Sequence, residues 1–309
     1  MGMAPSRRRP GMSAAEHRRL RRRWTIERNL TGWAFVAPVG LFFVLFLLIP
    51  VIGVFWWSMQ SGRLLGGNEF VGLENFGRIL NSIEASGALR TTVVFALLSV
   101  PTILVLAMVL GMSLARVKRG ATVYRFLVYF PVLVPPIVVG LIWVFLTHAD
   151  FGMFNVILRA VGADPVNWLS TTNALPVVAA ADVWRSVGYW AIFFVAAIMG
   201  LPRELYEAAH LDGANLVRRF WHVTLPGIRN ILLLAVLMAT IWALQVFEIV
   251  LVLTRGGPGT STRTAVYYVW WYVFGDGQVG LGAAISVLLL VVILTMSLAV
   301  VRLIRGRQA

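Results

Sequence analysis

Long apolar stretches separated by short polar segments dominate this chain and predict membrane-spanning helices. Crossing about 30 Å of hydrocarbon requires roughly 20 helical residues, and several stretches are long enough. They cover residues 33–58, 91–115, 124–147, 175–200, 230–253 and 279–301. The first follows an Arg-rich stretch, as in a signal peptide, but its apolar run is too long and lacks an A-x-A cleavage site, so we expect a retained helix. The pattern predicts an all-α membrane protein with six spans.

Positive charge is distributed unevenly among the segments that connect these spans. Of the 27 Lys and Arg residues, most lie in four places: the tail up to Arg28, residues 116–125, residues 203–229 and the C-terminal tail. Cytoplasmic flanks of spans carry an excess of Lys and Arg. We therefore expect both termini and the loop at 201–228 on the cytoplasmic side. The expected organisation is a basic cytoplasmic tail at 1–28 followed by a transmembrane domain at 29–309.

Composition limits the function classes further. The 59% hydrophobic residues and the mean hydropathy of +0.81 exceed the values typical of soluble domains. A net charge of +14 could indicate nucleic-acid binding, but the membrane topology already explains where the charge lies. We therefore expect no nucleic acid as a partner, whereas the basic tail can contact anionic membrane lipid.

Catalytic and metal-binding chemistry is sparse in this sequence. The chain has no Cys, which excludes disulfides, thiolate metal sites and Cys nucleophiles. Its four His residues are scattered and no His-Glu-x-x-His occurs, so we expect neither a metal site nor a catalytic residue. Lys118, the one lysine, lies outside any Gly-Lys-Ser/Thr phosphate-binding loop, so we do not expect this chain to bind ATP that way.

Three prolines interrupt the third expected span. Pro131, Pro135 and Pro136 remove backbone donors within six residues, so they must distort the helix. Freed carbonyls in a membrane are tolerated only against protein or a watery cavity, which places this span in the interior of the bundle. For any single proline, a kink that serves packing alone is an equal alternative to a functional bend.

Few ionisable residues lie inside the spans. Asp182 and Arg185 are three residues apart, so they can neutralise each other on one helix face. Glu248 has no opposite charge within one turn, and Gln245 lies on the same face. Such a carboxylate indicates either a site or a bond to a neighbouring helix, and both interpretations stay open. Together with Tyr189 and Trp242, Gln245 and Glu248 form a candidate substrate pathway, because they offer the acceptors, donors and stacking faces that sugars require.

A polar segment between the fourth and fifth spans predicts a helix, a turn and a second helix. Pro202 suits the first turn of a helix, and the acidic Glu204 and Glu207 suit its positive end. Asp212-Gly213 signals the end of this helix. Ala208 and Ala209 are small enough for another protein to approach the backbone closely, so we interpret the segment as a docking lever.

The second helix follows from an apolar repeat. Leu216, Phe220 and Val223 recur at intervals of four and three residues, which is typical of a short amphipathic helix. Thr224 can cap the next span, and Pro226 suits its first turn.

These residues resemble the EAA loop of permease subunits of ABC-type importers. The match consists of Glu207-Ala208-Ala209, Gly213 four residues later, and Val223-Thr224-Leu225-Pro226 after nine more. Val223 stands where isoleucine is commoner, and Asn230 where proline is frequent. The resemblance assigns coupling to the ATPase to Glu204, Glu207, Ala208, Ala209, Asp212, Gly213, Ala214, Phe220, Leu225 and Pro226.

A second stretch resembles the carbohydrate-importer permeases of the maltose and glycerol-3-phosphate type. Leu253-Thr254-Arg255-Gly256-Gly257-Pro258 matches the L-T-x-G-G-P loop of that family. The segments FVGLENF at 70–76 and VPPIVVGLIW at 134–143 are also similar. Glu248 stands where the family often has aspartate, which keeps the charge and adds a methylene.

The resemblance implies that the six spans pack as the six-helix bundle of the type I importer permease fold, in a multi-pass protein of a bacterial or archaeal cell membrane. It implies three kinds of partner: a second permease subunit, two ATP-binding subunits that hold ATP and Mg²⁺, and an extracytoplasmic sugar-binding protein. This chain is then expected to be no enzyme and to bind no cofactor. The resemblance assigns docking of the binding protein to the outer loop with Thr254, Gly256, Gly257 and Pro258, and we expect residues 262–274 to form an outer gate or interfacial helix.

The expected cargo is a neutral di- or oligosaccharide. A glycerophosphate-type solute is the alternative within the same machinery, but it would favour basic groups in the cavity, and Arg185 is the only basic residue away from the ends of the expected spans. A proton-coupled secondary carrier would explain Glu248 but not the spacing from Glu207 to Pro226.

Overall fold

The computed structural model describes residues 29, 32–62, 66–67 and 69–305, with side chains described up to 302. The basic tail predicted at 1–28 lies outside the described residues. The chain divides into two units, one ending at Trp56 and the other beginning at Trp57. The first unit contains most of the first span, in which a π-helical turn η1 (Val44–Leu48) leads into α2 (Ile49–Ser58).

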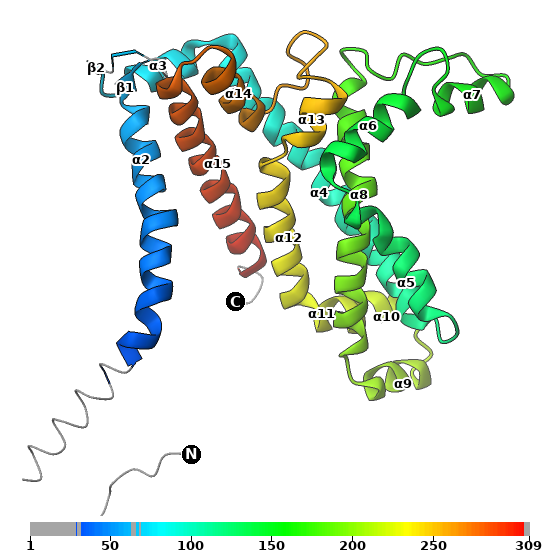
Figure 1. Cartoon of the computed structure of the whole chain (residues 1–309). Coiled ribbons are helices and arrows are strands. Elements are labelled where there is room, and N and C mark those ends of the chain that lie inside the picture. Colours follow the sequence, from blue (N-terminus) through cyan, green and yellow to red (C-terminus); the bar gives the residue numbers. More distant parts are fainter. Residues whose placement is uncertain (1–28, 30–31, 63–65, 68, 306–309) are drawn as a thin grey trace, which may run out of the picture. The chain divides into compact units, whose positions relative to one another are not determined.

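The second unit is almost entirely helical (Figure 1). A short hairpin pairs β1 (Gln60–Ser61) with β2 (Glu69–Phe70) in antiparallel register. The helices that follow are α3 (Glu74–Asn81), α4 (Ile83–Arg116), α5 (Ala121–Tyr129), η2 (Phe130–Leu133), α6 (Pro136–Leu146), α7 (Met153–Ala160), α8 (Ala174–Met199), α9 (Arg203–Leu211), α10 (Leu216–Arg219), η3 (Phe220–Thr224), α11 (Leu225–Gly227), α12 (Arg229–Leu244), α13 (Glu248–Leu253), α14 (Ala265–Trp270), η4 (Trp271–Gly275) and α15 (Val279–Arg305).

The number of spans agrees with the hydropathy pattern. Among the described residues, five helical segments are long and apolar enough to cross a membrane, and a bent helix pair brings the number to as many as six. The second span is longer than expected, because α4 begins at Ile83 instead of residue 91 and covers 34 residues. Ser82 starts this helix, since its side chain accepts a hydrogen bond from the Ala85 N–H at 3.2 Å.

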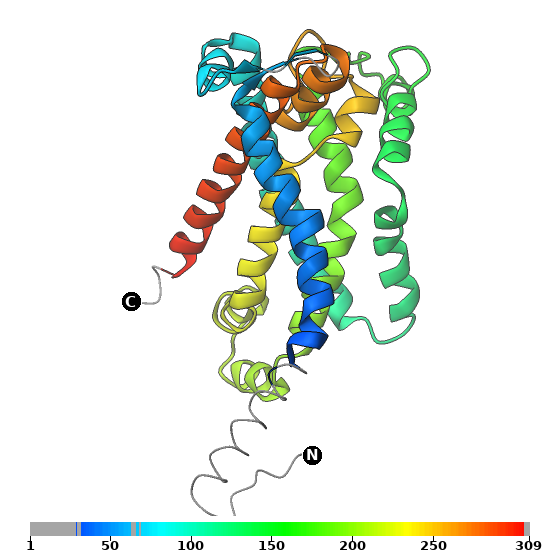
Figure 2. The same ribbon diagram turned by 60° about the vertical axis from the view of Figure 1, so that its left-hand side comes forward.

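The prolines break the third span, as predicted. The segment Ala121–Leu133 and the segment Pro136–Leu146 meet at an angle of 93°, and Figure 2 shows them as two separate helical pieces. Proline removes a helix donor and forces the preceding residue out of the helical region, so Pro135 and Pro136 account for the break.

The fifth span is also interrupted, which the sequence pattern did not predict. α12 ends at Leu244 and α13 begins at Glu248, so residues 245–247 leave the helical conformation. The predicted pathway residue Gln245 is the first residue of this break, and Glu248 directly follows it.

Two apolar clusters hold the second unit together. The larger cluster lies between α4, α8, α12 and α13 and includes Phe95 and Phe194, both without exposed surface. α4 and α8 approach closely at Gly111, where an added Cβ would lie 2.9 Å from the Phe194 Cβ atom. The smaller cluster joins α3, the start of α4, α14 and α15. Figure 1 shows α9, α10 and α11 at one end of the bundle and α3, α13 and α14 at the opposite end.

Candidate functional site

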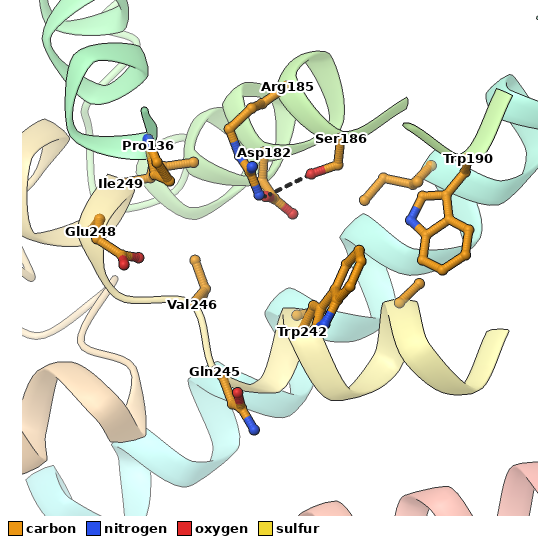
Figure 3. Close-up of a pocket in the computed structure, with 13 residues that line it drawn as sticks. Pro136, Asp182, Arg185, Ser186, Trp190, Trp242, Gln245, Val246, Glu248 and Ile249 are labelled. Atoms are coloured by element: carbon orange, nitrogen blue, oxygen red, sulfur yellow. Dashed lines mark hydrogen bonds and ion pairs between the residues drawn. The ribbon is translucent and has the colours of Figure 1, made fainter. Parts of the chain in front are cut away.

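A cavity lies where the broken fifth span faces α6 and α8 (Figure 3). Its lining residues are Ile103, Pro136, Asp182, Arg185, Ser186, Trp190, Ala239, Trp242, Ala243, Gln245, Val246, Glu248 and Ile249. The structure thus brings three of the four predicted pathway residues to one cavity: Trp242, Gln245 and Glu248. Its volume of about 80 Å³ is below the roughly 300 Å³ at which small-molecule sites begin. The cavity in this chain alone is therefore smaller than a typical small-molecule site.

One wall of the cavity is polar and belongs to α8. Asp182 accepts a hydrogen bond from the Ser186 hydroxyl at 3.2 Å, and an Arg185 nitrogen lies 3.5 Å from the same carboxylate oxygen. The predicted Asp182–Arg185 pair is confirmed. Arg185 Nε is buried and has no hydrogen-bond partner among the described residues, so this pair leaves a donor available.

The opposite wall carries aromatic and polar side chains of α12 and α13. Trp242 is 44% exposed in this chain, and its ring centroid lies 5.4 Å from that of the buried Trp190. Tyr189 does not line the cavity, but its ring packs edge-on against Trp242 at 5.3 Å and so supports the Trp242 ring from behind. Indole faces beside hydrogen-bonding groups suit a ligand with both apolar ring faces and hydroxyl groups.

Glu248 is the first residue of α13 and is exposed in this chain. Within the part of the chain that the structure describes, its carboxylate takes part in no ion pair. The position at a helix start stabilises the negative charge, because helix N-termini carry a partial positive charge. The carboxylate thus lies at the cavity and forms no ion pair with a neighbouring helix in the described part of this chain. Of the two interpretations of Glu248, this favours a site over a structural bond.

Two polar or aromatic lining residues, Ser186 and Trp190, were not predicted from the sequence. Ser186 and Trp190 follow Asp182 at intervals of four, so they lie on the same face of α8. Extending the helical repeat from Asp182 would have found both. Among the described residues, His, Asp and Glu side chains form no group of three that could hold a metal ion.

The segment at 201–228 forms the predicted helix, turn and second helix. α9 ends at Leu211, Asp212 is its C-cap, and Gly213 takes a left-handed conformation with φ 74°, which glycine adopts without strain. α10 and η3 then continue the chain to Thr224. The exposed residues among those predicted to couple are Glu204, Glu207, Ala208, Asp212, Gly213 and Pro226, whereas Ala209, Ala214, Phe220 and Leu225 are half-buried.

Two details of this segment differ from the expectations. Thr224 does not cap the next span; its hydroxyl lies 3.0 Å from the Tyr206 hydroxyl of α9, so it joins the two short helices instead. Pro202 precedes α9 as its N-cap, and Pro226 lies in α11, before the span that begins at Arg229. Asn215 caps α10, because its side chain accepts a hydrogen bond from the Arg218 N–H at 2.9 Å.

The segment at 254–264, which contains the L-T-x-G-G-P residues, is tightly folded. The Thr254 and Thr262 hydroxyls are 2.7 Å apart, and Thr262 also donates to the Gly257 carbonyl at 2.9 Å. Gly256 is buried with φ 79°, and a Cβ there would collide with Arg263 and Tyr267. Of the residues predicted to dock a binding protein, Pro258 is exposed, Thr254 and Gly257 are half-buried, and Gly256 is buried.

The helix expected at 262–274 begins at Ala265 and runs through α14 and η4 to Gly275. It is fastened at its start, because Thr264 donates to the Val246 carbonyl at 3.0 Å and Ala265 N–H donates to Thr92 Oγ1 at 2.7 Å. Burial, together with a hydrogen bond to Glu84, raises the pKa of Tyr268 above its ordinary range.

Comparisons with known proteins agree with this arrangement. The sequence profile of the family described as "Binding-protein-dependent transport system inner membrane component" matches residues 103–308. The chain is 34% identical over 279 residues to the trehalose/maltose transport system permease protein MalF of Thermococcus litoralis, covering 90% of this chain and 94% of the relative. It is 32% identical over 283 residues to the sn-glycerol-3-phosphate transport system permease protein UgpA of Agrobacterium fabrum, covering 90% and 96%.

A solved structure supports the fold. The crystal structure of a bacterial ABC transporter involved in the import of the acidic polysaccharide alginate contains a chain that superposes with a TM-score of 0.81 at 23% identity, covering 92% of this chain and 99% of that one. The six-helix permease fold is thereby confirmed. The profile match and the relatives together show that the chain belongs to the family of inner membrane components of binding-protein-dependent transport systems, the permeases of ABC transporters.

Proposed function

We propose that this chain is one of two permease subunits of an ATP-driven importer for a neutral di- or oligosaccharide. The observation that carries the proposal is the cavity between α8 and the broken fifth span. It combines indole faces, the Asp182–Arg185–Ser186 cluster and the side chains of Gln245 and Glu248. Stacking faces beside paired donors and acceptors are what a sugar needs from its site, and the second permease subunit would complete the enclosure.

The 201–228 segment supports a coupling role. Glu204, Glu207 and Ala208 on α9 are exposed. Several large apolar side chains are exposed too: Leu205, Leu211, Leu216, Val217 and Trp221. Exposed apolar patches of this kind mark protein interaction surfaces. In our proposal, two ATP-binding subunits dock here, bind ATP and Mg²⁺, and drive the bundle between two states, while both termini of the chain face the cytoplasm. ATP favours import only by favouring one of these states.

The family description itself implies a separate binding protein that delivers the cargo. We place its docking on the 254–264 segment, where Pro258 and Gly259 are exposed at the tip. This position lies at the opposite end of the bundle from α9 (Figure 1).

A glycerophosphate-type cargo is the second candidate. One relative is named for sn-glycerol-3-phosphate, and Arg185 offers a cationic group to the cavity. Asp182 already neutralises much of that charge and Glu248 adds a negative one, so the local balance disfavours a phosphate.

Purification of the whole importer through a tag on this chain tests the proposal. Reconstituted in liposomes with its binding protein, the importer should hydrolyse ATP faster when one disaccharide is present. If sn-glycerol-3-phosphate stimulates ATP hydrolysis and no sugar does, the cargo is a glycerophosphate and not a sugar. If the preparation contains no ATPase and uptake stops when the proton gradient is dissipated, the chain is a secondary carrier and the whole proposal is wrong.

Variants of the cavity localise the site. Trp242→Ala and Gln245→Ala should each lower sugar uptake about ten-fold, because one lost contact of this kind costs on the order of 1.4 kcal/mol. Trp184→Ala is the matched control, since Trp184 lies exposed on α8 but does not line the cavity.

A further inference from the structure

A second cavity lies at the end of the bundle that carries the 201–228 segment, and it is basic. Its volume is about 500 Å³. Its lining residues are Met112, Ala115, Arg116, Ile198, Met199, Leu201, Arg203, Tyr206, Leu216, Arg219, Phe220 and Thr224. The three arginines come from three different elements, α4, α9 and α10, so the fold gathers their charges at one place.

These charges are not balanced by the chain itself. No carboxylate lines the cavity, and within the described residues no ion pair involves Arg116, Arg203 or Arg219. The Nε atom of Arg219 is buried and has no hydrogen-bond partner among the described residues. A buried donor without an acceptor is costly, so an acceptor at the Nε atom of Arg219 is stabilising, and the exposed Arg116 and Arg203 add positive charge beside it.

The position of the cavity indicates the source of the anion. Arg116 is the last residue of α4, and Met199 is the last residue of α8, so the arginines lie where two spans end. The wall on the span side is apolar and consists of Met112, Ala115, Ile198 and Met199. In the proposed topology this is the cytoplasmic boundary of the hydrocarbon core, the level at which lipid headgroups lie.

We propose that this cavity binds the phosphate of an anionic membrane phospholipid. The guanidinium groups of Arg203 and Arg219 hold the phosphate oxygens, Arg116 contributes charge from the end of α4, and the apolar wall contacts the first methylenes of the acyl chains. Because Arg203 begins α9 and Arg219 ends α10, the lipid bridges both helices of the 201–228 segment to the end of α4. This inference does not depend on the identity of the cargo.

Lipid retention by the purified whole importer tests the inference. The probes are phosphatidylglycerol and, for comparison, phosphatidylcholine, titrated into delipidated importer in detergent and counted by native mass spectrometry. The parent importer should retain phosphatidylglycerol in preference to phosphatidylcholine. The double variant R203Q/R219Q should bind phosphatidylglycerol about ten- to thirty-fold more weakly. Each arginine near anionic lipid contributes a factor of about three to five in affinity, and the two factors multiply.

The control variant is R218Q. Arg218 is adjacent to Arg219 in α10 and is exposed, but it does not line the cavity. R218Q removes the same charge from the same helix, but outside the cavity. It should therefore leave phosphatidylglycerol retention within about two-fold of the parent. If R203Q/R219Q no longer assembles with the other subunits, the single variant R116Q is used in its place. R116Q should lower phosphatidylglycerol retention, but by less than the double variant.

Three results would overturn the inference. One is equal retention of phosphatidylglycerol by the parent and R203Q/R219Q. The second is displacement of the lipid by excess inorganic phosphate, which would make the cavity a site for a soluble anion. The third is an importer free of phosphatidylglycerol in which position 203 or 219 cross-links to a carboxylate of an ATP-binding subunit, which would assign the cavity to the protein interface.

Discussion

The 254–264 segment and the 201–228 segment lie at opposite ends of the bundle, and different kinds of contact attach each of them to the rest of the chain. The 254–264 segment is joined to its surroundings by polar bonds between distant elements. Thr264 reaches the carbonyl of Val246 in the broken fifth span, and Arg263 lies 3.3 Å from Glu84 at the start of α4. Directly after the segment, Ala265 N–H donates to Thr92.

The polar bonds of the 201–228 segment are local. The pair Tyr206–Thr224, the cap at Asn215 and the bond between His222 and the Arg218 carbonyl all have both partners inside the segment. The segment reaches the core through the apolar side chains of Leu201, Phe220 and Ile228. Apolar contacts are not directional, so they permit small rotations that a network of buried hydrogen bonds resists.

The difference indicates where motion is possible. The 254–264 segment and α14 act as a fixed platform, whereas the 201–228 segment can shift as a preformed unit against the bundle. Under the proposed function, this division suits rigid-body rocking, with the ATP-binding subunits docked at one end and the binding protein at the other.

The largest effect is expected from Gly213→Pro. Gly213 has φ 74°, which proline cannot adopt, so the turn between α9 and α10 should be lost and sugar uptake abolished. Membrane insertion, measured by fractionation, should be unaffected. Gly162→Pro is the matched control, because Gly162 has φ 78° after α7 and lies outside the segment. Normal uptake by Gly213→Pro would contradict the docking role.

A smaller effect, on stability, is expected from Thr92→Val. Thr92 is fully buried and accepts from Ala265 N–H, so valine leaves a buried donor unpaired at a cost of about 1–3 kcal/mol. The thermal midpoint of the purified importer should fall. Thr102→Val is the control on the same helix, since its hydroxyl is exposed and bonds only within α4. Equal midpoints for both variants would show that the platform is not fixed by this bond.

Tyr206→Phe should have a moderate effect at the other end. It removes the bond to Thr224 and about 0.5–1.5 kcal/mol of local stability, without cutting the segment from the bundle. Amide hydrogen exchange in α9 should become faster while exchange in α14 is unchanged. Tyr124→Phe, at an exposed tyrosine of α5, should change neither. Faster exchange in both α9 and α14 would contradict independent fastening of the two segments.

The smallest effect is expected from Arg78→Gln. Arg78 and Glu74 form an exposed ion pair at 2.7 Å within α3, and such pairs contribute at most about 0.5 kcal/mol. The thermal midpoint should stay close to that of the parent. A fall as large as that of Thr92→Val would mean that surface charges, not buried bonds, fix this end of the bundle.

The sequence predicted the spans and the turn at Gly213 because both have strong local signals, apolar length and an Asp-Gly pair. It placed the start of α4 too late, because Glu84 and Arg90 lower the hydropathy of a region that is helical but lies beyond the apolar run. It missed the break at 245–247 because neither proline nor glycine occurs there.

The candidate site was predicted in part for a similar reason. Trp242, Gln245 and Glu248 stand out as polar or aromatic residues in an apolar span. The sequence analysis chose Tyr189, whereas its neighbour Trp190 lines the cavity. The two aromatic residues are adjacent on α8, and hydropathy does not show which of them faces the cavity. The Thr224–Tyr206 bond joins residues eighteen positions apart and follows only from the packing of two helices.

The interruption at 245–247 has a mechanical consequence. It makes the fifth span a hinge between two rods, the 16-residue α12 and the 6-residue α13. The short rod packs against α6, whereas the long rod packs against α4 and α15, so the two rods rest on different neighbours. Under the proposed function, a change of angle at this hinge would alter the spacing of Trp242 and Glu248, which line the cavity from the two sides of the interruption.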